Sequence, residues 1–228
     1  MPILALAASI ALAGCQERAA APAVAAEAPQ PPRPPRNPLR NAYFGDLHLH
    51  TSYSFDALAS GTTTVPDDSY RFAMGGTVDY MGRPVRRRVP LDFLAVTDHA
   101  EYLGEVREAL DPKGRFSATD WPRLFAQTDT AARNALFSRL TDSGFQGGPR
   151  IKEFLDAEMI AGNWRREVAA AERNYHPGRF TTFAAFEWSA MPGGAHLHRN
   201  VIFRGPKFPD RPFSAIDSPR PEDLWSYA

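Results

Sequence analysis

Five of the six histidines fall into three short groups, two of which also carry an aspartate. The groups are Asp46-Leu47-His48-Leu49-His50, Asp98-His99 and His196-Leu197-His198, and Glu187 follows a separate apolar run. Imidazoles and carboxylates gathered in this way can bind Zn, Mn or Fe, and no cysteine accompanies them to suggest copper(I) or an iron–sulfur centre. We expect two or three divalent ions, with Glu187 as the carboxylate that bridges them.

Each group lies at or beside the end of a predicted strand. Apolar runs predict strands over residues 42–47, 91–97, 180–186 and 197–203, the first two of them buried. Alternate residues of a strand share one face, so His48 and His50 point to the same side, as does Asp46. We expect Asp46 to orient a ligand without binding an ion itself.

Each group also has an ordinary interpretation. A solvated histidine pair, a capping aspartate and a glutamate at a strand edge are all common in proteins that bind no metal. The three groups and Glu187, at four strand ends, are difficult to explain as independent accidents, which favours one shared site.

The remaining pattern predicts strands that alternate with helices. A proline and acidic residues begin a helix over residues 66–74, and a hairpin surrounds residues 81–84. Residues 100–175 are expected to be mostly helical, most clearly over 123–140 and 151–174, and a further helix begins at Pro221. This order predicts an α/β fold with its active site at the carboxyl ends of the strands.

The first 40 residues are expected to lie outside the folded domain. Residues 3–13 are apolar but too few to span a bilayer, and Leu12-Ala13-Gly14-Cys15 resembles the lipobox of bacterial lipoproteins. We expect a signal peptide over residues 1–14, lipidation of Cys15, a tether rich in proline and alanine over 15–40, and a folded domain over 41–228. An ordinary secretory signal or a buried thiol are the alternatives.

A lipid anchor would place the protein in the bacterial cell envelope. Gln16 follows the cysteine instead of the aspartate that retains many lipoproteins in the inner membrane, so we expect the periplasmic side of the outer membrane. The 26 basic and 26 acidic residues balance, which excludes a general nucleic-acid binder. A single cysteine in 228 residues also excludes a small domain held together by disulfides.

Several of these residues together resemble the PHP (polymerase and histidinol phosphatase) superfamily of metal-dependent phosphoesterases, and in particular a bacterial PHP-like branch known as a domain of unknown function. The resemblance rests on the following residues: residues 46–51, Ser54, Asp56, residues 97–99, Glu187 and His198. It implies a distorted (β/α)7 barrel with a trinuclear site. The family's later histidine and final Asp-x-His motif have no counterpart before Ala228, so we expect a C-terminally truncated fragment of an enzyme.

The resemblance also implies roles for individual residues. His48 and His50 would bind one ion together with Glu187, and Glu187 would bridge to a second ion that also takes His198. Asp56 and His99 would serve the third ion. His196 receives no role.

The expected reaction is hydrolysis of a small-molecule phosphoester, or a related ester, by a metal-bound hydroxide, with His99 or Asp98 relaying protons. An amidohydrolase-type metallohydrolase is an alternative, but it normally needs a bridging lysine, and the chain has only Lys113, Lys152 and Lys207. A membrane-tethered protein that binds metal or ligand without catalysis is the third possibility.

Overall fold

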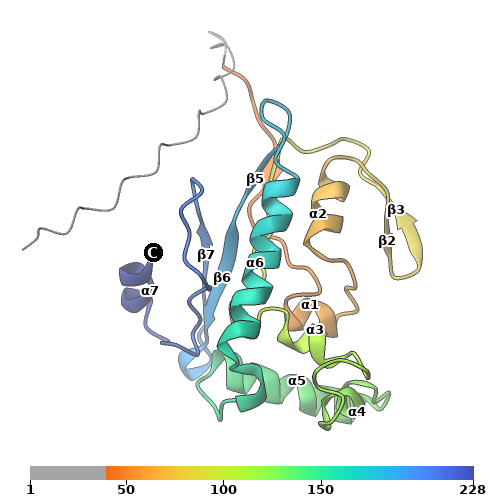
Figure 1. Ribbon diagram of the computed structural model, residues 1–228, viewed down its shortest axis with the longest axis vertical. Helices are drawn as coiled ribbons and strands as arrows, with labels where there is room; N and C mark the ends of the chain where they lie inside the picture. Colours follow the sequence, from red (N-terminus) through yellow and green to blue (C-terminus); the bar gives the residue numbers. More distant parts are fainter. Residues whose placement is uncertain (1–39) are drawn as a thin grey trace, which may run out of the picture. The chain divides into compact units, whose positions relative to one another are not determined.

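The computed structural model describes residues 40–228, which form a mixed α/β fold (Figure 1). The expected signal peptide, Cys15 and the expected tether up to residue 39 lie outside the described residues. Within residues 40–228, no helix combines the length and apolar character needed to cross a bilayer.

Three short parallel strands form the first sheet, in the order β1 (Gly45–Asp46), β4 (Phe93–Ala95) and β5 (Thr181–Phe183). Strand β6 (Ala185–Ala190) follows β5 almost directly and pairs antiparallel with β7 (Leu197–Ile202). A parallel bridge between His99 and Glu187 joins the extension of β4 to β6. The segment that follows β4 therefore lies beside β6. Within residues 40–228 the sheets do not close into a barrel.

The alternation of side chains along β6 separates a core face from a polar face. All six residues of β6 are buried, and Phe186 and Trp188 pack with Trp164 and Leu103 in one apolar cluster. Glu187 has the opposite parity, so it points away from that cluster. A strand with an apolar face this well packed can hold a buried carboxylate in a fixed position.

Two helices pack against the parallel strands. Helix α6 (Ala157–Arg173) packs beside α2 (Pro66–Ala73), as Figure 1 shows. Tyr70 of α2, Leu94 of β4 and Ala170 of α6 belong to one buried cluster. This packing fixes β4 and therefore the position of the residues that follow it.

The other elements surround this core. Their bounds are as follows: α1 (Phe55–Ala59), β2 (Val78–Tyr80), β3 (Arg83–Val85), α3 (Glu105–Ala109), α4 (Trp121–Phe125), α5 (Thr130–Phe145), the 3-10 turns η1 (Lys152–Phe154) and η2 (Pro192–Gly194), and α7 (Pro221–Tyr227). The predicted helix at 66–74, the hairpin around 81–84 and the helix beginning at Pro221 are confirmed.

Three sequence predictions were wrong in their details. The strand predicted over 42–47 is reduced to two exposed residues at a sheet edge. The helix predicted over 123–140 is two helices, because Asp129 caps a new one by accepting a hydrogen bond from the backbone N–H of Ala132. The helix predicted from 151 begins at Ala157, since Asp156 caps it in the same way and residues 152–154 form a separate 3-10 turn.

Candidate metal centre

The buried carboxylate of Glu187 lies at the centre of the histidine groups. Its side chain has no solvent exposure, and its two oxygens face different partners. Oε2 lies 2.7 Å from His50 Nε2 and 3.1 Å from His48 Nε2, whereas Oε1 contacts His198 Nδ1. A carboxylate divided between two sets of imidazoles has the arrangement of a bridging ligand.

His50 and His99 connect this carboxylate to a second one, on helix α1. Asp56 Oδ1 lies 3.4 Å from His50 Nδ1, and Asp56 Oδ2 lies 3.4 Å from His99 Nε2. Phe55, the neighbour of Asp56, is buried with its ring centroid 6.2 Å from that of His99. Helix α1 thus holds Asp56 against the histidines through the packing of the residue beside it.

Three overlapping groups of side chains could each hold one ion. They are His48, His50 and Glu187; His50, Asp56 and His99; and His99, Glu187 and His198. Within each group the ligand atoms lie within 4.8 Å of one another. The structure thus brings together all six of the residues expected as ligands, from five separate segments of the chain.

The charges in the cluster favour a cation. Burial by itself would raise the pKa of Glu187, but hydrogen bonds from His50 and His198 and the charges of His99 and His50 lower it to about 2. The pKa of Asp56 is likewise held well below its usual range by His50 and His99, against the effect of burial. Burial lowers the pKa of His50, yet Asp56 and Glu187 outweigh it and raise the value to about 10. Two carboxylates therefore remain ionised and attract positive charge.

Ser189 lies between three of these side chains and was not anticipated from the sequence. Its hydroxyl lies 2.9 Å from His99 Nδ1, 3.0 Å from Glu187 Oε1 and 3.1 Å from His198 Nδ1. When the hydroxyl donates to Glu187, it can accept from the Nδ1–H of His99, which leaves His99 Nε2 free to face Asp56. The sequence could have predicted this position, because Ser189 is two residues after Glu187 on one strand and therefore lies on the same face.

Asp98 points away from the cluster. Its Oδ1 accepts hydrogen bonds from the Thr51 backbone N–H at 2.5 Å and the Ser54 hydroxyl at 2.8 Å, and its Oδ2 accepts from the Thr51 hydroxyl at 2.5 Å. Ser54 in turn accepts from the backbone N–H of His99 at 2.9 Å. These contacts favour a positioning role for Asp98 over proton relay, because it joins the segment after His50 to the segment before His99.

Asp46 and Glu101 support the ligand-bearing segments in different ways. Asp46 Oδ1 accepts a hydrogen bond from the backbone N–H of His48 at 3.1 Å. Glu101 is fully buried, accepts from the backbone N–H groups of Ser189 and Ala215, and has Oε2 3.9 Å from His99 Nδ1. Burial raises the pKa of Glu101 to about 8 although those two backbone donors lower it. Sequence reasoning missed Glu101, although it follows His99 at the two-residue spacing of a strand face.

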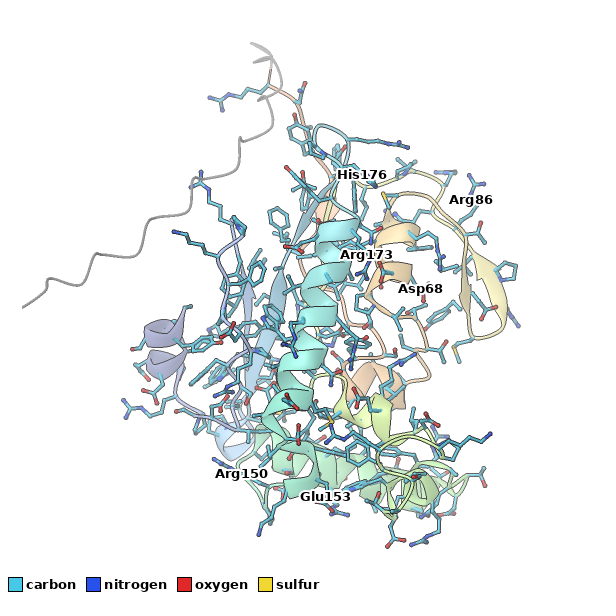
Figure 2. The ribbon with its side chains drawn as sticks, viewed as in Figure 1. Asp68, Arg86, Arg150, Glu153, Arg173 and His176 are labelled. Atoms are coloured by element: carbon cyan, nitrogen blue, oxygen red, sulfur yellow. The ribbon has the colours of Figure 1, made fainter. Side chains whose placement is uncertain are left out.

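The two histidines without an expected role lie in different places. His196 is exposed, and its Nδ1 lies 3.3 Å from His198 Nε2, at the edge of the cluster. His176 lies in the turn between α6 and β5, ahead of the amino end of β5 (Figure 2). It belongs to none of the three ligand groups found within residues 40–228.

The donor set fits divalent ions of intermediate character. Four imidazoles and two carboxylates converge from the segments after β1 and β4, from helix α1 and from strands β6 and β7, and all contribute nitrogen or oxygen ligands. Two imidazole nitrogens, His48 Nε2 and His50 Nε2, lie only 3.1 Å apart and face the same oxygen of Glu187. Such a convergence of electron-pair donors is suited to a shared cation.

Comparison with known proteins gives a family but no named activity. Residues 37–228 match the family model described as "Protein of unknown function (DUF3604)". No curated protein and no solved structure matches the chain.

Proposed function

We propose that this chain, which belongs to the DUF3604 family, is a metal-dependent hydrolase that acts on small phosphoesters or related esters at a site of two or three divalent ions. The observation that supports this most directly is the buried Glu187 carboxylate, whose two oxygens face separate sets of imidazoles. The buried carboxylate of Asp98, by contrast, faces only hydroxyl and backbone N–H donors.

The ions would supply two kinds of chemistry when bound, since they activate water near neutral pH and neutralise charge on phosphoryl oxygens. The chain's own residues hold them in place. Glu187 and His99 are fixed by buried backbone, Asp56 is supplied by α1, and Ser189 orients His99 and His198. No side-chain nucleophile is required, which agrees with a cluster made only of imidazoles and carboxylates.

The PHP-like distorted barrel with a trinuclear centre is part of this proposal. This part is supported by the three adjacent parallel strands, in the order β1, β4 and β5. It is also supported by the positions of the candidate ligands, which follow β1 and β4 or lie on β6 and β7. The carboxyl ends of parallel strands are where α/β barrels place their active sites. The proposal also includes a lipid anchor at Cys15 on the periplasmic side of the bacterial outer membrane, which rests on the sequence alone.

Elemental analysis combined with hydrolysis assays tests the proposed function. We expect the purified protein to retain Zn, Mn or Fe and to hydrolyse a phosphomonoester or phosphodiester such as a nitrophenyl phosphate. The His48→Ala variant should lose both metal and turnover, because it removes an imidazole that faces Glu187. The His176→Ala variant is the matched control, since His176 lies outside the cluster, and it should retain both. A protein that holds no metal would contradict the proposal.

Two other functions remain as alternatives. A membrane-tethered metal binder without catalysis would retain metal but show no turnover even with every ligand in place. An amidohydrolase-type enzyme would need a lysine beside the ions, whereas Lys113, Lys152 and Lys207 are all exposed. The positions of these lysines count against that alternative.

A further inference from the structure

A hollow of about 640 Å³ lies among helices α1, α3, α4 and α5, outside the histidine cluster. These four helices gather at one end of the fold (Figure 1) and contact one another in pairs. Leu58, Leu124 and Leu136 line the hollow together with residues 60–63. Its volume is within the range of small-molecule sites, and its walls are mainly apolar, as in such sites.

One face of α5 forms a wall of the hollow. Thr130, Arg133, Asn134 and Phe137 line it and recur at three- and four-residue spacing, which places them on one side of the helix. Phe137 keeps 39% of its surface exposed, and so does Leu110, another residue that lines the hollow. Exposed apolar side chains that line an open hollow are stabilised when an apolar ligand covers them.

Arg133 gives the hollow a positive end. Its side chain is exposed and lines the hollow, and no carboxylate of residues 40–228 lies within ion-pairing distance of it. The hydroxyl of Thr130 and the side-chain amide of Asn134 lie on the same face of α5. A guanidinium without an anionic partner beside hydrogen-bond donors can bind a carboxylate.

We propose that this hollow binds a small amphipathic carboxylate, with its apolar chain or ring against Leu58, Leu124 and Phe137 and its carboxylate at Arg133. The apolar walls would contact the chain or ring of such a ligand, and the unpaired arginine would bind its carboxylate. The site is separate from the proposed metal centre, because the ring of Phe55 stands between them. That ring lies 6.2 Å from the ring of His99 and 6.0 Å from that of Phe137, by centroid distance.

Calorimetric titration of the full chain with octanoate and with 1-octanol tests this inference. We expect octanoate to bind more tightly than 1-octanol. The Arg133→Gln variant should weaken octanoate about 3- to 10-fold, the range of a partly exposed ion pair with hydrogen bonds, and change 1-octanol less than about twofold. The Arg123→Gln variant is the matched control, because Arg123 is an exposed arginine on α4 that does not line the hollow.

A second variant tests the location of the apolar part. Ala59→Trp should place an indole ring in part of the hollow and weaken binding of both ligands, whereas Ala131→Trp, on α5 but outside the lining, should leave binding unchanged. The proposal is overturned if octanoate does not bind, if Arg133→Gln weakens both ligands equally, or if Ala59→Trp has no effect. None of these outcomes depends on metal content or hydrolysis, so they are distinct from a failure of the proposed function.

Discussion

Two regions of the molecule bury carboxylates in opposite ways. In the candidate metal centre, Glu187 and Asp56 face imidazole nitrogens, and the pKa of each is lowered. On α6, Glu167 has no hydrogen-bond partner for either oxygen among the described residues, and on α3, Glu105 has none for its Oε2. Burial raises the pKa of both glutamates well above the usual value.

The difference shows that burial alone does not mark a site for a cation. A buried carboxylate without donors is neutralised by a proton, because an isolated charge in the interior is too costly. Glu187 stays ionised because several basic groups converge on it, and such convergence is what a metal ion requires. Comparing the two kinds of carboxylate therefore separates a candidate metal ligand from a merely buried acid.

Removing the charge of Glu187 should have the largest effect. We expect Glu187→Gln to lower metal affinity about 100-fold or more and to abolish metal-dependent hydrolysis, since even residues that only orient ligands cost 10- to 100-fold when they are replaced. Metal titration of the stripped protein measures the affinity. The equally buried Glu167→Gln should retain the metal, and a similar loss in both variants would remove the distinction between the two regions.

Asp98 provides an intermediate case, a buried carboxylate held by neutral donors. Asp98→Asn should lower the free energy of unfolding by about 2 kcal/mol, because an amide N–H₂ group would face the Thr51 N–H or a hydroxyl that now donates. Denaturant unfolding measures this change. The shape of the pH–rate profile should stay the same, and the disappearance of one limb of that profile would instead indicate proton relay by Asp98.

Glu167 should show the smallest effect, and only at higher pH. Its pKa is raised in the folded state, so the folded protein binds the proton more tightly and stability falls as pH rises above the unfolded pKa of about 4.3. Glu167→Gln removes that loss, so it should raise the free energy of unfolding at pH 8 and change it little at pH 4. Unfolding at both pH values measures it.

The exposed Glu172→Gln on the same helix is the control for this prediction. It should leave the pH dependence of stability unaltered. If Glu167→Gln and the original protein lose stability in parallel between pH 4 and pH 8, then Glu167 does not carry a raised pKa in the folded state.

Strand parity and apolar patterning predicted much of the site from the sequence. His48, His50, Glu187 and His198 were expected to converge because each lies on the polar side of a strand or just beyond its end. The same parity could have separated Asp98 from His99, since adjacent residues of a strand face opposite sides. Glu101 and Ser189 were missed because a single glutamate or serine gives no local pattern until the strands that flank it are placed.

Element boundaries depended on single capping residues that apolar periodicity does not detect. Asp129 and Asp156 each begin a helix by accepting a backbone hydrogen bond, and both lie inside or beside spans that were predicted as continuous. The strand expected to be buried at 42–47 failed for another reason. Its aromatic residues, Tyr43 and Phe44, are exposed beside an edge strand, and sequence pattern does not distinguish an edge from a centre.

Solvent access across the histidine cluster is uneven, and this has a consequence for how ions would leave it. The side chain of His48 is 55% exposed, that of His198 31% and that of His50 16%, whereas Glu187 is completely covered. A chelator would reach an ion beside His48 first and an ion enclosed by His99 and Glu187 last. Stripping the protein would then proceed in steps, and species that carry fewer ions than the full set would accumulate on the way.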